Sequence, residues 1–207
     1  MEVLMLNGSN KYNGCTNAAL EEAGKILEEE GIGFEIFQIG SAAIRDCVDC
    51  RKCDGKRCVF GDDGVNDFIE KARNADGFVF GTPVYFAHPS GRILSFLDRV
   101  FYSTDEDLFA GKPAFAVASA RRAGTTASLD VMNKYFGIGG MITVGSTYWN
   151  VVHGFTPDDV RADEEGMQTM RNSARYMAWL IKCIGAGKAQ GIQRPQTEHD
   201  FRTDFIR

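Results

Sequence analysis

The sequence lacks several features that would place it in other classes of protein. Its formal charge is −5 at pH 7, so it lacks the excess of lysine and arginine that general nucleic-acid binders usually show on one face. No apolar run approaches the roughly 18–20 residues that cross a bilayer. It has no internal repeat, low-complexity segment or interdomain linker, and 207 residues suffice for one well-cored domain. We therefore expect a single domain over residues 1–207, with a polar tail from about residue 190.

The pattern of a secretion signal is also missing from the first residues of the sequence. The first six residues have no basic region followed by a long apolar region, and so they do not resemble a signal peptide. This favours a cytoplasmic protein in a reducing compartment. In such a compartment, clustered cysteines are more often ligands or redox groups than structural disulfides.

Cysteine is not abundant, but it is concentrated in one place. Four of the six cysteines fall within twelve residues, at Cys47, Cys50, Cys53 and Cys58. Four thiolates so close together suit a metal ion, an iron–sulfur cluster or thiol redox chemistry. Two-residue spacings are usual for [4Fe–4S] sites, whereas zinc motifs more often come as two separated pairs. A cluster, a zinc ion, a disulfide and free thiols remain alternatives at this point.

Apolar runs and amphipathic patterns alternate along the chain. Buried strands are predicted at residues 3–6, 34–39, 78–81, 114–119 and 141–145. Helices are predicted over about 17–30, 65–74, 89–102, a stretch after Gly124, and 163–188. Five alternations of strand and helix are typical of an α/β fold with a doubly wound parallel sheet and three layers. Five strands favour the flavodoxin-like order 2-1-3-4-5 over the six-stranded dinucleotide fold.

The first loop at the carboxyl ends of these strands is rich in glycine, hydroxyls and amides. In such a sheet, ligands bind beyond the carboxyl ends of the strands. Backbone N–H groups, a helix dipole and two hydroxyls can together cradle a phosphate here. The candidate residues are Ser9, Asn10, Lys11, Gly14, Cys15, Thr16 and Asn17. The loop is neither a Walker A motif nor G-x-G-x-x-G, and the alternative is a helix simply capped by Thr16 or Ser9.

Two further loops follow the third and fourth strands. An apolar wall with exposed backbone N–H groups suits a flavin ring, and arginines suit a flavin or the phosphates of an incoming nicotinamide nucleotide. The candidates are Pro83, Val84, Tyr85 and Phe86 after the third strand, and Ser119, Arg121, Arg122 and Gly124 after the fourth. The alternatives are core packing for the first group and a solvated basic loop for the second.

Together, these segments resemble the NADPH-dependent FMN reductase branch of the flavodoxin-like superfamily. The resemblance is carried by residues 8–16, 47–63, 75–86 and 96–99, which cover the first half of the chain well and the second half loosely. It implies non-covalently bound FMN, with the phosphate in the loop from Ser9 to Asn17. It places the flavin ring on Pro83 to Phe86 and on the loop from Ser119 to Gly124. It also implies a homodimer or homotetramer.

Within that branch, the iron–sulfur flavoproteins carry a compact four-cysteine motif similar to this one. In them the motif binds a [4Fe–4S] cluster close to the flavin, while other members keep similar cysteines without a cluster. The resemblance thus makes Cys47, Cys50, Cys53 and Cys58 candidate cluster ligands. Because they follow the second strand, we expect them at the same end of the sheet as the flavin loops.

Three side chains outside these motifs receive specific expectations. Cys183 is expected to be buried on the last helix. Backbone N–H groups near Cys15 could depress the pKa of its thiol, and the alternative is that this position merely requires a small residue. The neighbouring acids Asp62 and Asp63 are expected to cap the second helix.

The leading functional hypothesis is an FMN-dependent NAD(P)H oxidoreductase of the FMN reductase or quinone reductase type. It would take a hydride from NADH or NADPH and pass electrons to a small-molecule or protein acceptor. The chemistry is borne by the flavin, so no catalytic side chain is expected. One alternative is an iron–sulfur flavoprotein that carries single electrons. Another is a non-redox nucleotide-binding module that shares the fold.

Overall fold

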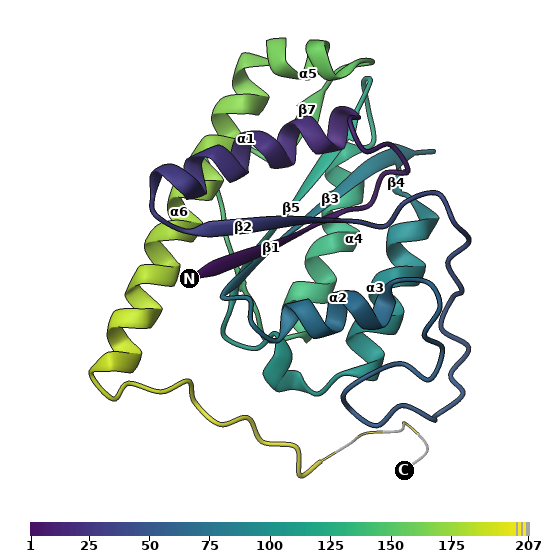
Figure 1. Ribbon diagram of the computed structural model, residues 1–207, viewed down its shortest axis with the longest axis vertical. Coiled ribbons are helices and arrows are strands. Elements are labelled where there is room, and N and C mark those ends of the chain that lie inside the picture. The colour runs from purple at the N-terminus through teal and green to yellow at the C-terminus, as the bar shows by residue number, and fades with distance from the viewer. Residues whose placement is uncertain (202, 204, 206–207) are drawn as a thin grey trace.

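The computed structural model describes residues 1–201, 203 and 205, and it has three layers with a parallel sheet in the middle (Figure 1). The strands run in the order β2-β1-β3-β5-β6, with β7 also paired to β5 and β4 to β3. Their bounds are β1 Glu2–Asn7, β2 Gly33–Gln38, β3 Gly77–Tyr85, β4 His88–Pro89, β5 Pro113–Ala120, β6 Ile142–Thr143 and β7 Val151–His153. This is the flavodoxin-like order predicted from the sequence, so the fold prediction is confirmed.

Helices cover both faces of the sheet because both faces are apolar. One face packs against α1, α5 and α6, and the other against α2, α3 and α4. The bounds are α1 Cys15–Glu29, α2 Val65–Ala72, α3 Gly91–Ser103, α4 Thr125–Ile138, α5 Pro157–Ala162 and α6 Glu164–Ala189, with a 3-10 turn, η1, at Glu106–Leu108. The alternation of side chains along a strand sends Val3 and Met5 of β1 to the first face, and Leu4 and Leu6 to the second.

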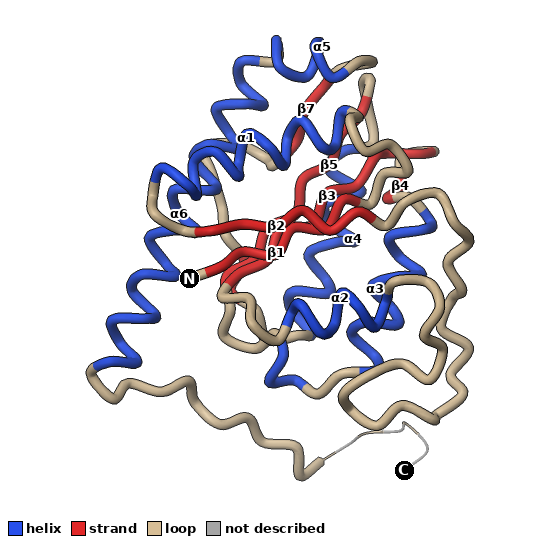
Figure 2. The backbone as a smooth tube through the Cα atoms, in the orientation of Figure 1, coloured by secondary structure: helices blue, strands red, loops and turns tan. Residues whose placement is uncertain are grey.

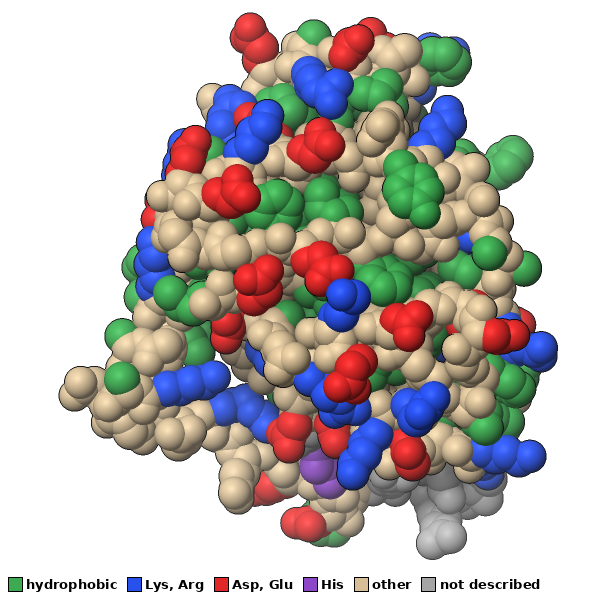
Figure 3. Space-filling model, viewed as in Figure 1, with side chains coloured by type: hydrophobic (Ala, Val, Ile, Leu, Met, Phe, Trp, Pro, Cys, Tyr) green, Lys and Arg blue, Asp and Glu red, His purple; other side chains and the backbone are tan. Residues whose placement is uncertain are grey.

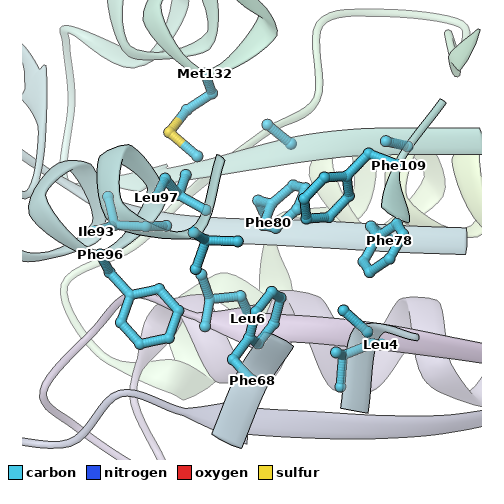
Figure 4. Close-up of a cluster of buried hydrophobic side chains, with 14 of the residues drawn as sticks. Leu4, Leu6, Phe68, Phe78, Phe80, Ile93, Phe96, Leu97, Phe109 and Met132 are labelled. Atoms are coloured by element: carbon cyan, nitrogen blue, oxygen red, sulfur yellow. The ribbon is translucent and has the colours of Figure 1, made fainter. Parts of the chain in front are cut away.

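Aromatic residues dominate the core between the sheet and α2, α3 and α4 (Figure 4). Phe80 of β3 packs against Phe68 of α2, which in turn packs against Phe96 of α3. Phe68 and Phe96 pack edge to face, with 5.5 Å between ring centroids. Such pairs stabilise the fold by about 0.5–1.5 kcal/mol beyond their buried area. This core fixes α3 rigidly on the sheet, which matters because α3 contacts both candidate sites.

Besides the two-residue strand β4, two features of the fold were not predicted. The fifth strand is interrupted: β6 pairs with the start of β5, β7 pairs with its end, and residues 144–150 leave the sheet between them. The segment 144–150 and α4 line a cavity of about 450 Å³, to which Tyr148 and Trp149 contribute. The second feature is the short helix α5. The predicted strand at 141–145 therefore holds only for its middle residues.

One face of the molecule can be compared with the expectation that the protein lacks a basic surface. On the face drawn in Figure 3, acidic and basic side chains are interspersed rather than gathered into a patch of one sign. Among the described residues, no helix is long and apolar enough to cross a membrane. The segment after α6 is extended and exposed, and Arg194 ties it to Asp107 at 2.5 Å.

Candidate functional site

The loop after β1 is ordered by its own short polar side chains. The Oδ1 atom of Asn7 accepts a hydrogen bond from the Ser9 N–H, and the Ser9 hydroxyl accepts one from the Lys11 N–H. The Asn7 amide donates to the Lys11 carbonyl. These turns bring the chain directly to the start of α1. The polar side chains of Asn7, Ser9, Thr16 and Asn17 are all buried.

Helix α1 begins without a cap. Gly14 occupies the N-cap position, no side chain bonds to the first-turn N–H groups, and the first turn contains no acidic residue. The predicted alternative, a cap by Thr16 or Ser9, is therefore wrong. The first N–H groups of a helix have no partners within the helix, and together with the dipole they favour a bound anion. The start of α1 thus has the donors that a phosphate needs.

Three loops converge at the carboxyl edge of the sheet. The hydroxyls of Thr16 and Ser119 lie 2.8 Å apart and link the start of α1 to the end of β5. The Gly8 N–H donates to the Gly81 carbonyl at 2.8 Å, and the Ser90 hydroxyl donates to the Gly8 carbonyl. We call residues 8–17, 82–90 and 119–124 the carboxyl-edge loops. They contain every residue that the sequence suggested for the cofactor.

The second of these loops is a hairpin with a strained tip. Strands β3 and β4 pair through Val84–Pro89 and Tyr85–His88, and the tip residues Phe86 and Ala87 both have positive φ, at 53° and 59°. L-residues adopt this region at a cost, and such strain concentrates at functional sites. Phe86 is fully exposed and Tyr85 largely so, whereas Pro83 and Val84 are half-buried.

The third loop holds this hairpin in place. Gly124 has a φ of 90°, and a Cβ atom there would lie 2.4 Å from the Ala87 Cα atom. Only glycine therefore allows the β5–α4 loop to approach the hairpin tip so closely. In the same loop, Arg121 and Arg122 are exposed, and neither guanidinium has an ion pair or hydrogen bond with any residue that the structure describes. Both are free to meet an anionic ligand.

Cys15 differs from its expectation. Burial raises the pKa of its thiol, and the nearby backbone N–H and Lys11 lower it less than burial raises it. The predicted depressed pKa is therefore wrong. The Cys15 thiol lies 3.8 Å from the Gly154 carbonyl oxygen, which links α1 to the residue after β7.

The four clustered cysteines line one small cavity. Cys47, Cys50, Cys53 and Cys58 surround it together with Phe60, Arg99 and Tyr102. All six cysteines of the chain are free thiols. The cysteines lie on the long loop between β2 and α2 (Figure 2). The sequence prediction that these four thiols form one group therefore agrees with their placement.

Arg99 is the side chain that organises this cavity. It extends from α3, is 1% exposed, and its Nε atom donates to the Cys58 sulfur at 3.3 Å. Its other nitrogens bond to the Asp63 carboxylate and to the carbonyls of Arg45 and Phe60. Burial lowers the pKa of the guanidinium, but the bonds to Asp63 and Cys58 outweigh this and raise it.

Asp63 therefore does not cap α2, and that prediction is wrong. Gly64 is the N-cap of α2 and no side chain caps the helix. One carboxylate oxygen of Asp63 pairs with Arg99, and the other is buried without a partner. The prediction that Cys183 is buried is also wrong, because this residue is exposed on α6.

Other contacts hold the ends of the cysteine segment. Asn66 of α2 accepts from the Cys58 N–H at 2.8 Å and donates to the Cys58 carbonyl at 2.9 Å. The Tyr102 hydroxyl donates to Asp49 at 2.6 Å. Asp49 and Arg51, on either side of Cys50, both have positive φ. The backbone around Cys50 is thus held in a conformation that L-residues disfavour.

The cavity does not lie at the carboxyl edge, which corrects the expected position. Helix α3 begins at that edge, where the Ser90 hydroxyl bonds to Gly8. The loop after β2 then follows α3: Arg92 binds the Gly40 and Ala42 carbonyls, Arg99 the Arg45 carbonyl, and Tyr102 binds Asp49. Ten residues of helix span about 15 Å. The cysteines therefore lie near the far end of α3 from the carboxyl-edge loops.

The four thiols provide the type of donor that an iron–sulfur cluster requires. Among the described residues, no group of three or more His, Cys, Asp or Glu side chains is placed to hold one metal ion. A tetrahedral zinc with Zn–S bonds of about 2.3 Å needs its sulfurs about 3.8 Å apart. A cubane binds each thiolate to a different iron and so tolerates wider separation. Four thiols line one cavity here, and the buried guanidinium of Arg99 lies beside them.

The sequence alone did not reveal Arg99, Tyr102 or Asn66 as parts of a site. Arg99 lies in a helix whose apolar residues suggest only core packing, and burial of an arginine is rare without a partner. Cys58 lies 41 residues before Arg99 in the chain, so their contact leaves no local signal in the sequence.

Comparison with known proteins adds independent findings. The family model described as NADPH-dependent FMN reductase matches residues 1–156. An iron–sulfur flavoprotein of Methanocaldococcus jannaschii is 30% identical over 193 residues, which cover 89% of this chain and 99% of that protein. One from Archaeoglobus fulgidus is 30% identical over 194 residues, or 87% of this chain and 97% of its own length.

Solved structures show the same fold at low identity. RosB superposes with a TM-score of 0.71 at 16% identity, covering 100% of this chain and 94% of that one. An archaeal flavodoxin superposes with a TM-score of 0.59 at 12% identity, covering 88% of this chain and 99% of that one.

Proposed function

The chain belongs to the family of NADPH-dependent FMN reductases and is an FMN-dependent oxidoreductase; from this premise we propose that the carboxyl-edge loops hold FMN and that NADH or NADPH reduces it there. The observation that carries the proposal is the uncapped start of α1 beside the buried Thr16–Ser119 hydroxyl pair. When bound, FMN supplies two-electron chemistry by accepting a hydride. The residues of this chain supply position, charge and exclusion of water.

The phosphate would be bound by the start of α1. The N–H groups of Cys15, Thr16 and Asn17 point out of the first turn, and no side chain competes for them. The Ser9 and Thr16 hydroxyls add donors, and Lys11 and the helix dipole add positive charge. Asn10 and Gly14 complete the loop, and Gly14 leaves the N-cap position without a competing side chain.

The flavin ring would lie on the β3–β4 hairpin. Pro83 and Val84 form a half-buried apolar base, and Tyr85 and Phe86 extend it outward. The strained tip presents its backbone in a fixed conformation, because Gly124 packs directly against Ala87. A site built in advance needs little reorganisation when the ring binds. Arg121 and Arg122 would then meet the phosphates of the nicotinamide nucleotide.

Substitution of Thr16 by valine tests the phosphate site. The change keeps the side-chain volume and removes the hydroxyl that bonds to Ser119. We expect FMN affinity to fall by about 1–3 kcal/mol, or roughly 5- to 150-fold. The exposed Thr143→Val on β6 is the matched control and should bind FMN as the wild type does. Unchanged FMN affinity of Thr16→Val, measured by fluorescence titration, would refute the phosphate site.

Reduction by a nicotinamide nucleotide is a separate test. Purified protein loaded with FMN should oxidise NADH or NADPH anaerobically in a single turnover, observed as bleaching of the flavin absorbance. If neither nucleotide bleaches the flavin but a protein donor does, then the chain is an electron carrier rather than a reductase.

A second proposed function concerns the four cysteines, and a specific observation favours it. Cys47, Cys50, Cys53 and Cys58 line one cavity, beside the buried cation of Arg99. The curated relatives above carry the name iron–sulfur flavoprotein. We propose that these four thiols bind a [4Fe–4S] cluster that exchanges single electrons with the flavin or with a partner. Its electron acceptor can be a small molecule or a protein.

Iron analysis under anaerobic conditions decides this second proposal. A cubane requires four irons and four sulfides per chain. We expect Cys58→Ala to lose the iron, and Cys183→Ala on α6 to retain it as the control. Less than about one iron per wild-type chain would reject the cluster.

The proposal also includes a homodimer or homotetramer. Large side chains are exposed on α6, where Tyr176 and Trp179 lie one turn apart. Exposed aromatic residues are common at subunit interfaces. A measured native mass equal to that of one chain would contradict this part of the proposal.

A further inference from the structure

Among the residues that the structure describes, Arg99 joins the wall of the cysteine cavity to the body of the protein through a buried charge. We propose that Arg99 is a positioning residue that raises the reduction potential of the cluster held by Cys47, Cys50, Cys53 and Cys58, through its Nε–H bond to the Cys58 sulfur. The inference rests on the cluster proposed above. It goes beyond that proposal because it assigns a tuning role to a residue outside the ligand set.

The hydrogen bonds of the Arg99 guanidinium hold it in a single orientation. Four of its donor contacts are taken by Asp63, Cys58, and the carbonyls of Arg45 and Phe60. A planar, multiply bonded guanidinium cannot rotate away from the sulfur without breaking several bonds at once. The Nε–H is therefore fixed on Cys58, which is itself 4% exposed.

The sign of the effect follows from charge. Reduction adds one electron to a cluster that four thiolates already make anionic, and the electron comes from the external reductant. A nearby fixed cation stabilises the reduced form more than the oxidised form. Hydrogen bonds to the cluster's sulfurs and local charge are recognised determinants of these potentials. Burial strengthens both effects, because water is not present to screen them.

Asp63 provides a second test of the inference, because it contacts Arg99 on the side away from Cys58. Its carboxylate pairs with the guanidinium and partly cancels the positive charge, and one of its oxygens is buried without a partner. Loss of the Asp63 charge should therefore raise the potential, and loss of the Arg99 charge should lower it. A purely structural role of the pair predicts no such opposition, because a loosened loop would change both variants in the same direction.

A matched control lies on the same helix. Arg92 also extends from α3 and also binds carbonyls of the loop after β2, at Gly40 and Ala42. It lies seven residues, or about 10 Å, before Arg99, and it does not contribute to the cavity. Arg92→Gln thus removes an equivalent charge and an equivalent tie without touching a cysteine.

The experiment measures the midpoint potential of the cluster by EPR-monitored titration of the anaerobic holoprotein. Arg99→Gln should shift the potential negatively by at least the equivalent of a tenfold change in the one-electron equilibrium constant, which is 59 mV. Asp63→Asn should shift it positively, and Arg92→Gln should leave it at the wild-type value. Iron content and circular dichroism are recorded for each variant.

The outcomes separate the two proposals. If wild-type protein holds no iron, both the cluster and this inference fail. If it holds the cluster but Arg99→Gln has the wild-type potential, only this inference fails. If Arg99→Gln does not fold, Asp63→Asn decides alone, because it retains the Arg99–Cys58 bond and changes only the charge behind it. A negative or absent shift in Asp63→Asn would overturn the inference.

Discussion

At the scale of single residues, two arginines of the carboxyl-edge loops differ from other charged side chains of the surface in their ion pairing. Some charged side chains on the surface are paired, as Arg171 is with Glu22 and Lys182 with Glu30. Arg121 and Arg122, in contrast, form no ion pair with any residue that the structure describes. An unpaired arginine next to a proposed cofactor site is available for the phosphates of a second nucleotide.

Replacement of Arg121 or Arg122 by alanine should therefore raise the KM for NADPH by about tenfold, the equivalent of one exposed charge-assisted hydrogen bond. The value of kcat should change little, because uniform binding is lost rather than transition-state stabilisation. Steady-state kinetics at two salt concentrations checks this, since the loss should shrink at high ionic strength. Arg175→Ala on α6 is the control. An unchanged KM in both variants would remove these arginines from the site.

The positions of some residues in the fold could be predicted from the sequence, and those of others could not. Ser9, Thr16 and Ser119 were predicted because they follow strands, and the carboxyl ends of parallel strands share one edge. Asp63 was assigned to the nearer helix because an acid before a helix usually caps it. Its actual partner, Arg99, is 36 residues away in the chain. A contact over such a distance depends on tertiary packing and leaves no local signal.

At the scale of elements, the start of helix α1 lacks the stabilisation that a side-chain cap would provide. A helix whose N-cap is glycine lacks the hydrogen bond that Ser, Thr, Asp or Asn would provide. The absence is consistent with a site that must accept an anion, because a carboxylate at this position would compete for the same N–H groups.

Gly14→Asp should therefore change stability and affinity in opposite directions. We expect the FMN-free protein to gain roughly a few tenths of a kcal/mol in its free energy of unfolding. We expect FMN affinity to fall, because the carboxylate occupies the N–H groups and repels the phosphate. Urea denaturation and FMN titration measure the two effects. Gly14→Ala, which adds a Cβ atom without the carboxylate, is the control, and a gain in both quantities for Gly14→Asp would contradict this account.

Helix α5 provides a pH prediction of known sign. Backbone and side-chain hydrogen bonds from Thr156 lower the pKa of Asp159, which forms a capping box with that threonine. A carboxylate whose pKa is lower in the folded state stabilises the fold above its ordinary pKa of about 3.9, and that contribution is lost as the pH falls through the folded value. Stability should thus drop below about pH 4, and Asp159→Asn should show a smaller drop in acid denaturation followed by circular dichroism. An equal drop in both proteins would reject the assignment.

Element boundaries show where sequence reasoning ends. The five helices with clear apolar stripes were predicted, but α5 has six residues and only Val160 is buried, which is too short a pattern to read. The split of the last strand into β6 and β7 was missed because each piece has three residues or fewer. The order of the strands is not visible in the sequence, and the number of strands only favoured the flavodoxin-like order that the structure shows.

At the scale of the whole molecule, FMN binding should stabilise the fold. A ligand that binds only the folded state adds RT ln(1 + [L]/Kd) to the free energy of unfolding, about 2.7 kcal/mol at 100 times Kd. The melting temperature should therefore rise with FMN concentration, as measured by thermal denaturation. Thr16→Val should need a higher concentration for the same rise. A melting temperature that is independent of FMN would show that the chain does not bind it.

The global placement of the two candidate sites was only half predictable. The carboxyl-edge loops had to meet because the topology of a parallel sheet requires it. The segment 39–64 has no helix or strand, so the sequence does not fix how far it runs from the edge where it begins. Arg92, Arg99 and Tyr102 determine its course along α3.

Helix α3 consequently fixes how the two sites are rotated relative to each other about its axis. Its first turn is joined to the loop after β1, and its last turns carry Arg99 and Tyr102 toward the cysteines. One inserted residue between Arg92 and Arg99 would rotate everything after it by about 100° and advance it by about 1.5 Å. Neither site could compensate for such a turn independently. Among homologous chains that retain both sites, this helix should vary in sequence but not in length.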